Sequence, residues 1–242
     1  MRTLPLGFAL SLFGAAVVCA DDSLAHARQA QAMLGPDVWS QVIHIENAAR
    51  RSPYPSTLHA LVFELEGVLW FYSDRDGTQS FSLQRGRLAE EKADFGPLLR
   101  DIDQGFTRWS VVAGADSAAK AARGPLPNGC FIQSVVASRG LGAGADQLQL
   151  LAYYVRTSSG LRGHTVLTYK TRGHLAVLDP ERPLQAQEFS EALSHDALTL
   201  ARAVRGGDVV GARLLPLGAL GWRSKDYSMA ATAGEPSEST QS

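Results

Sequence analysis

The sequence predicts an α+β fold in which one helix packs on an antiparallel sheet. Residues 130–139 form an apolar run compatible with a helix, and Gly140 follows its end. Three runs with strand character come next, at residues 147–156, 163–170 and 174–178, with turn signals between them. Strands joined by short turns pair antiparallel, so the helix and these strands together indicate the α+β class.

The first elements of the chain are a helix and a strand. We expect a short helix at residues 23–34, because Ser23 can cap its start and Gly35 stands just past its end. Residues 39–45 then alternate between apolar and polar side chains, as a strand with one buried face does.

A β-hairpin is expected next. Residues 58–72 are rich in Val, Leu, Phe and Trp and indicate one bent strand or two. The run Asp-Arg-Asp-Gly at residues 74–77 is a turn signal, and strand character resumes at residues 78–83. Residues 87–102 are expected to be helical in part, with an interruption at Gly96-Pro97.

Three further elements complete the prediction. Residues 115–122 are rich in alanine and favour a short helix, and residues 188–204 show the spacing of an amphipathic helix. Residues 209–217 favour a last strand. From residue 229 onward the chain is small and polar, which favours disorder.

The N-terminus has the pattern of an export signal. Arg2 gives a short basic start, residues 4–18 are mainly apolar, and Ala20 is a small residue before Asp21. The apolar run is shorter than the roughly 20 residues that span a bilayer, so we expect cleavage after Ala20 and a periplasmic or extracellular protein. Cys19 leaves open a lipid-anchored alternative, although a lipid-acceptor cysteine normally follows a small residue.

The sequence thus divides into four segments. They are an export signal (1–20), an N-terminal helix and hairpin region (21–123), a core that contains the predicted sheet (124–228) and a disordered tail (229–242). No later run is apolar and long enough to span a membrane. The formal net charge is −1, and no basic patch or basic amphipathic helix occurs, so we expect neither nucleic acid nor a lipid surface as a partner.

No metal or cofactor is expected. After signal cleavage a single cysteine remains, which can form neither an internal disulfide nor a structural zinc site. No pair of histidines has the spacing of metal ligands. His26, His59 and His195 are expected at the surface, and His174 is expected to be exposed after a turn.

Cys130 stands where a thiol can become reactive. It follows Pro127-Asn128-Gly129, at the expected start of a helix. A helix start offers partial positive charge and free backbone N–H groups, which favour a thiolate. An imidazole nearby could take the thiol proton, and a carboxylate behind that imidazole could orient it.

His164 and Asp179 have the spacing that such a pair requires. If Thr171 and Arg172 form a two-residue loop, His164 and Asp179 pair directly across two antiparallel strands, with Cβ atoms roughly 5 Å apart. If the loop is Arg172-Gly173, the two residues form a diagonal pair on one face. Both loops therefore bring the imidazole and the carboxylate to the same side of the sheet.

The runs "NGCFIQSV" and "GHTVLTYKTRGHLAVLDP" resemble the cysteine, histidine and aspartate segments of the papain-like and transglutaminase-like superfamily. The resemblance covers residues 125–180. It implies a helix that opens at the cysteine and packs on an antiparallel sheet. It also implies Cys130 as nucleophile, His164 as base and Asp179 as the residue that orients the base.

The resemblance implies a secreted enzyme that transfers acyl groups from an amide or peptide bond, with a peptide or protein as substrate. An oxyanion donor could be the backbone N–H of Cys130, or the side chain of Gln104, Trp109 or Asn128, of which Asn128 is nearest in sequence. One alternative is a non-catalytic relative that binds peptide or cell-wall material in the same cleft. Another is a structural protein with a buried thiol.

Overall fold

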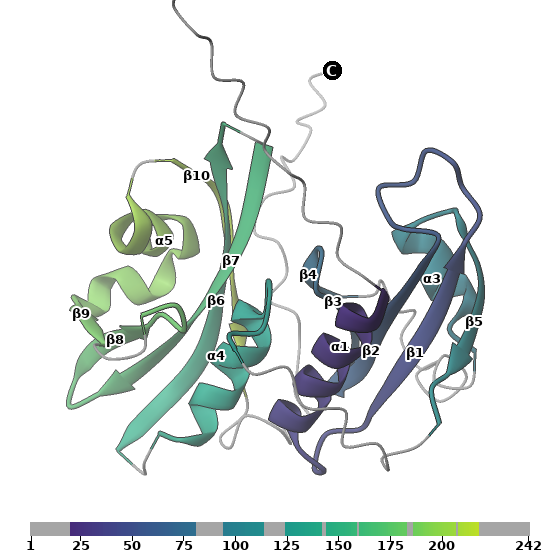
Figure 1. Ribbon diagram of the computed structural model, residues 1–242. Coiled ribbons are helices and arrows are strands. Elements are labelled where there is room, and N and C mark those ends of the chain that lie inside the picture. Colours follow the sequence, from purple (N-terminus) through teal and green to yellow (C-terminus); the bar gives the residue numbers. More distant parts are fainter. Residues whose placement is uncertain are drawn as a thin grey trace, which may run out of the picture.

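The computed structural model describes residues 20–80, 94–113, 124–141, 144–158, 160–182, 186–206 and 208–217 (Figure 1). Two five-stranded antiparallel sheets and four α-helices make up this part of the chain. The predicted α+β class is therefore confirmed. Outside the described residues lie positions 1–19 of the expected export signal (1–20), the Ala-rich segment at 115–122 and the tail expected at 229–242.

The first sheet has the strand order β4-β3-β2-β1-β5. Its strands are β1 (Ser40–Asn47), β2 (Thr57–Leu65), β3 (Val68–Ser73), β4 (Gly77–Ser80) and β5 (Phe106–Val111). The expected run at residues 58–72 is two strands, because Glu66 and Gly67 take positive φ angles of 54° and 74° and reverse the chain. The predicted hairpin of β3 and β4 is present, with its turn at residues 74–76.

The second sheet has the strand order β10-β6-β7-β8-β9. Its strands are β6 (Ala145–Thr157), β7 (Gly160–Thr171), β8 (His174–Leu178), β9 (Gln187–Phe189) and β10 (Val209–Pro216). The three strands predicted after the cysteine helix are β6, β7 and β8, paired in sequence order. Every strand of the first sheet precedes residue 124 and every strand of the second follows it.

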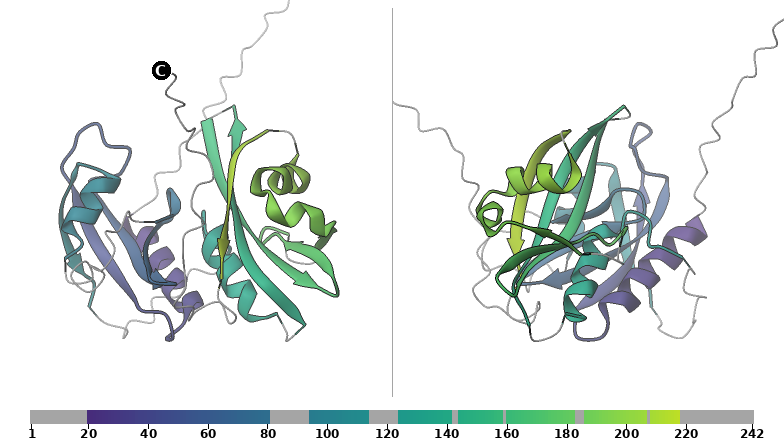
Figure 2. Two further views of the ribbon diagram at one scale, coloured as in Figure 1. Left: turned by 180° about the vertical axis from the view of Figure 1, so that it is seen from behind. Right: turned by 90° about the vertical axis from the view of Figure 1, so that its left-hand side faces the viewer.

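The helices and sheets form alternating layers (Figures 1 and 2). Helices α1 (Ala20–Leu34) and α4 (Cys130–Arg139) lie between the two sheets, and one apolar core joins all four. Helix α3 (Gly96–Ile102) covers the outer face of the first sheet, and α5 (Ala197–Arg205) covers the outer face of the second. In the described part of the chain, no helix is long and apolar enough to cross a lipid bilayer.

One helix prediction was wrong, and another is confirmed only in part. The segment 188–204 is not one helix: β9 pairs with β8, a 3-10 helix follows at Glu191–His195, and α5 begins only after Asp196. Asp196 has extended backbone angles, and its side chain accepts a hydrogen bond from the Leu198 N–H, so it caps a new helix. Gly96-Pro97 begins α3, since proline is well tolerated in the first helical turn, and residues 87–93 of the expected segment lie outside the described part of the chain.

Candidate active site

Cys130 is the first residue of α4, as predicted, and Gly129 is the N-cap. The helix is fixed from both sheets. The buried Ser134 hydroxyl donates to the carbonyl oxygen of Thr165 on β7 at 3.1 Å. On the other side the Phe131 ring packs on Trp70, with ring centroids 4.4 Å apart. These contacts hold the start of α4 at the boundary between the sheets.

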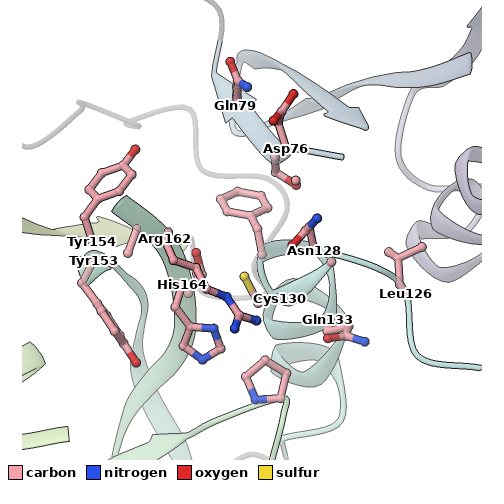
Figure 3. Close-up of a pocket in the computed structure, with 18 of the residues that line it drawn as sticks. Asp76, Gln79, Leu126, Asn128, Cys130, Gln133, Tyr153, Tyr154, Arg162 and His164 are labelled. Carbon is pink, nitrogen blue, oxygen red and sulfur yellow. The ribbon is translucent and has the colours of Figure 1, made fainter. Parts of the chain in front are cut away.

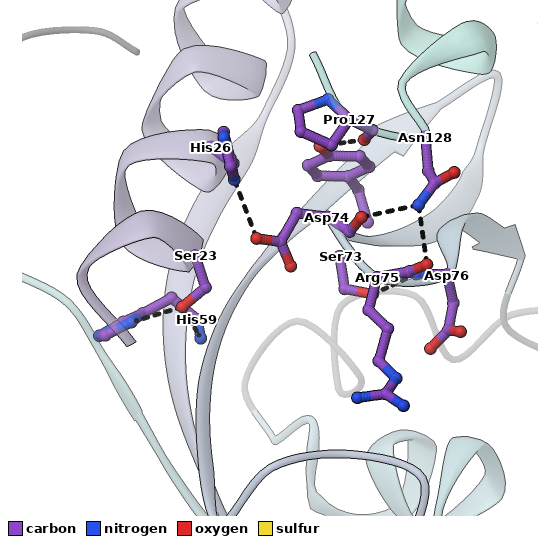
Figure 4. A network of polar contacts seen from close by, with 10 residues as sticks. Ser23, His26, His59, Ser73, Asp74, Arg75, Asp76, Pro127 and Asn128 are labelled. Carbon is purple, nitrogen blue, oxygen red and sulfur yellow. Dashed lines mark hydrogen bonds and ion pairs between the residues drawn. The ribbon is translucent and has the colours of Figure 1, made fainter. Parts of the chain in front are cut away.

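The loop before Cys130 is tied to the β3–β4 turn (Figure 4). The Tyr72 hydroxyl donates to the carbonyl of Pro127 at 2.8 Å. The Asn128 amide donates to the backbone carbonyls of Asp74 and Arg75 at 2.7 and 2.8 Å. Gly77 lets this contact form, because a Cβ there would lie 2.7 Å from the Asn128 carbonyl oxygen.

These hydrogen bonds argue against the Asn128 side chain as an oxyanion donor. Its amide nitrogen already serves two backbone carbonyls, although the residue lines the cleft described below. The other two candidates do not line that cleft. Gln104 donates to the Arg100 carbonyl, and Trp109 packs on Phe95 at the outer face of the first sheet. Among the named candidates, the backbone N–H of Cys130 is the one left for this role.

His164 and Asp179 meet on the face shared by β7 and β8. The strands pair through a loop at Arg172-Gly173, so the alternative loop at Thr171-Arg172 was wrong. Arg172 and Gly173 both have positive φ, at 50° and 80°, which a two-residue hairpin loop of this kind requires. The β-branched Thr171 would be strained in that conformation and stays in the strand.

The imidazole of His164 is oriented by two neighbours. Its Nε2 lies 3.0 Å from Oδ1 of Asp179, and both side chains are largely buried, with 12% and 24% exposed. The ring of Tyr153 on β6 meets the imidazole edge to face, with centroids 5.5 Å apart. Since Nε2 donates to the carboxylate, Nδ1 is the ring nitrogen left for the Cys130 sulfur.

The electrostatics of the site favour a protonated imidazole. Burial by itself lowers the pKa of His164, but hydrogen bonding to Asp179 and Cys130, with their negative charges, raises that pKa to about 9. Burial likewise opposes ionisation of Asp179. Hydrogen bonds from His164 and from the backbone N–H of Glu181 outweigh it and hold the pKa of Asp179 below its usual range.

Cys130 and His164 line a cleft of about 880 Å³ between the two halves of the protein (Figure 3). Its walls come from the start of α4, from the inner face of β6 and β7, and from the β3–β4 turn. Tyr153 and Tyr154 point to opposite sides of β6, and both line the cleft, but Tyr153 is buried whereas Tyr154 is exposed. Tyr154 and Leu161 are 56% and 63% exposed there, which leaves apolar surface open beside the cysteine.

Four other histidines were predicted to lie at the surface. His174 and His195 are exposed, as predicted. The prediction that His26 and His59 lie at the surface was wrong, because both side chains are partly buried. Each makes a contact between α1 and the first sheet or its β3–β4 turn. His26 Nδ1 lies 2.9 Å from an Asp74 carboxylate oxygen, and His59 bonds the hydroxyl of Ser23.

Several residues of the site were not predicted. Tyr153 could have been found as the residue opposite His164 once β6 and β7 were paired. Arg162 could also have been found, since it precedes His164 by two residues on β7 and shares its face, whereas the place of Glu181 depends on how the chain leaves β8. Comparison with known proteins gives no match to a family model, to a curated protein or to a solved structure.

Proposed function

We propose that this chain is an exported, thiol-dependent acyl-transfer enzyme that acts on an amide or peptide bond. Cys130 is the nucleophile, His164 is the base and Asp179 orients the base. One observation carries the proposal. A largely buried imidazole has a carboxylate 3.0 Å from one ring nitrogen, and it lines an open cleft together with Cys130, the only cysteine of the described residues, which helps to raise the pKa of that imidazole.

The proposal includes a papain-like or transglutaminase-like core. Three features support it: the cysteine opens a helix, the helix packs on an antiparallel sheet, and histidine and aspartate come from adjoining segments of that sheet. The Ser134 hydrogen bond to the carbonyl of Thr165 ties the cysteine helix to the residue that follows His164. The spacing between nucleophile and base is thus set by a buried contact.

The first half of the reaction forms an acyl-enzyme. The Cys130 thiolate attacks the carbonyl carbon of the substrate amide, and the carbonyl oxygen takes the negative charge next to the start of α4. When this intermediate collapses, the carbon–nitrogen bond breaks. The nitrogen leaves as an amine after it takes the proton from His164 Nδ1, and a thioester to Cys130 remains.

The second half releases the acyl group. Water or a second amine gives a proton to the now neutral His164 and attacks the thioester carbon. The carbon–sulfur bond breaks and Cys130 leaves as a thiolate beside the protonated imidazole. Water yields a carboxylic acid and an amine yields a new amide, and the same three residues serve both outcomes.

The form of the cleft supports a peptide or protein as the substrate. The cleft measures about 880 Å³, and Cys130 lines it together with the polar β3–β4 turn and residues of β6 and β7. The exposed side chains of Tyr154 and Leu161 offer apolar contacts to a chain bound there. The same two residues also favour the rival function, a non-catalytic protein that binds peptide in this cleft.

Catalytic turnover distinguishes the acyl-transfer enzyme from the peptide-binding protein. The purified protein is incubated with unfolded casein, with and without a fluorescent primary amine, and Cys130→Ala serves as the matched control. Release of new amino groups, or incorporation of the amine, that Cys130→Ala abolishes supports the enzyme. Casein binding of equal strength in both proteins, without either product, supports the binding protein.

A further inference from the structure

A second carboxylate lies next to the imidazole of His164. Oε1 of Glu181 lies 3.7 Å from Nδ1, the nitrogen that the proposed reaction uses for proton transfer. The same oxygen lies 3.4 Å from a guanidinium nitrogen of Arg162. Arg162, His164 and Glu181 all line the cleft. One carboxylate oxygen therefore stands between a permanent cation and the catalytic ring.

The strand register explains this placement. The β7–β8 ladder ends at the pair Leu167 and Leu178, and its continuation would put Glu181 directly opposite His164. The chain leaves the strand through Asp179, whose carboxylate accepts a hydrogen bond from the Glu181 backbone N–H at 2.9 Å. Asp179 thus orients the ring through Nε2. It also fixes the chain segment that places Glu181 near Nδ1.

We propose that Glu181 is a positioning residue for His164: its carboxylate stabilises the protonated imidazole at Nδ1 and neutralises the Arg162 cation beside it. This inference rests on the roles proposed for Cys130 and His164. The proton on Nδ1 is the one that the leaving amine must receive. Glu181 and Arg162 act on it with opposite signs, so together they set the pH range in which His164 can donate.

Exposure makes the effect moderate. The side chains of Glu181 and Arg162 are 52% and 66% exposed, so water screens their charges, and the pair adds little to folding stability. A unit charge at about 4 Å in water is worth roughly 1 kcal/mol, which is about 0.7 pH unit. His164 is only 12% exposed, so water screens the ring less than it screens the two charged side chains.

Other charged groups also act on this ring and are left unchanged by the test. They are Asp179 after β8 and Cys130 on α4, with Arg182 acting on Asp179 and Arg205 on α5 acting on the neighbouring Tyr153. The test therefore compares variants only at Glu181 and Arg162. Glu188→Gln is the matched control, because it removes one exposed carboxylate of β9 that does not contact His164.

The test follows the His164 ring by NMR during a pH titration, with His164→Gln used to assign the signal. Glu181→Gln should move the midpoint down by about 0.7 pH unit, and Arg162→Gln should move it up. The double variant should return close to the unchanged protein, and Glu188→Gln should shift the midpoint by less than about 0.2 unit because of screening.

A purely structural salt bridge gives a different pattern, in which both single variants shift the midpoint in the same direction or not at all. Either result would overturn the inference. The NMR titration does not depend on turnover. An unreactive Cys130 would therefore rule out the proposed function without affecting the Glu181 result. A reactive Cys130 with an unmoved His164 midpoint would rule out only the role of Glu181.

Discussion

Nε2 of His164 lies 3.0 Å from Oδ1 of Asp179, although the two residues are diagonal neighbours in the β7–β8 hairpin. The loop at Arg172-Gly173 keeps them on one face, and the Tyr153 ring holds the imidazole from the side. As a result one ring nitrogen is committed to the carboxylate. The other is available to the cleft, where Cys130 begins α4.

Asp179→Asn should lower the pH at which His164 loses its proton. An amide cannot neutralise the imidazolium, and loss of an adjacent carboxylate lowers a histidine pKa by about 1 to 3 units. The NMR titration of the His164 ring measures this shift. Asp146→Asn, at an exposed position of β6, is the control and should leave the midpoint in place. A midpoint equally unmoved in Asp179→Asn would show that the carboxylate does not act on the ring.

Folding stability should fall between about pH 6.5 and 9 through this one group. The pKa of His164 rises from 6.5 to about 9 in the folded protein, so the folded state binds the proton more tightly. Its contribution is complete below pH 6.5 and disappears as the pH passes 9. The difference in Tm between the unchanged protein and His164→Gln should therefore be largest near pH 6 and small at pH 10. A difference that stays constant with pH would contradict the raised pKa.

Gly77→Ala should destabilise the protein more than Gly67→Ala. Both glycines have positive φ, at 75° and 74°, so each alanine costs about 1 kcal/mol of backbone strain. At Gly77 a Cβ would also lie 2.7 Å from the Asn128 carbonyl, whereas nothing lies within 4 Å at Gly67. We expect about 1 to 3 kcal/mol of additional loss in the free energy of unfolding, measured in urea.

The same pair tests whether the β3–β4 turn positions Cys130. Gly77→Ala should also slow alkylation of Cys130, because the Asn128 segment leads directly into α4. Gly67→Ala should leave the alkylation rate unchanged, since the β2–β3 turn does not line the cleft. Equal alkylation rates in the two variants would show that the β3–β4 turn does not position Cys130.

Export should remove the first 20 residues. Small residues before Asp21 and a short apolar run favour cleavage after Ala20. Material from the periplasm of a bacterial host should begin at Asp21 by mass spectrometry, and Ala20→Arg should retain the signal. Lipid attached to Cys19 would instead support the lipid-anchored alternative, and an intact Met1 on exported protein would remove the signal-peptide hypothesis.

Local signals explain where the sequence prediction succeeded. Helix α4 begins and ends as expected because Pro127-Asn128-Gly129 precedes it and Gly140 follows it. Strand β5 was missed for the opposite reason: only Phe106 of its six residues is buried, so it lacks the apolar alternation of a strand. The long helix expected at residues 188–204 failed because apolar spacing continued past Asp196, where the chain starts a new helix.

The residues of the candidate site also differ in whether local sequence signals could predict them. Cys130, His164 and Asp179 could be named because two simple loops place the last two on one face. The loop that forms is the one whose residues tolerate positive φ. Neighbours that depend on tertiary packing could not be named. The Ser134 bond to the Thr165 carbonyl requires the helix to lie on β7, and the Glu181 approach requires the exit of the chain from β8.

The rate at which iodoacetamide alkylates Cys130 in the folded protein at pH 6 tests the central claim most directly. An ordinary thiol, with a pKa of about 8.5, is almost fully protonated there and reacts slowly. We expect fast labelling of Cys130 that His164→Ala slows at least ~10-fold by removing the cationic partner, while His174→Ala, at an exposed position, changes nothing. Slow labelling that His164→Ala leaves unchanged would contradict the account and identify Cys130 as an ordinary thiol.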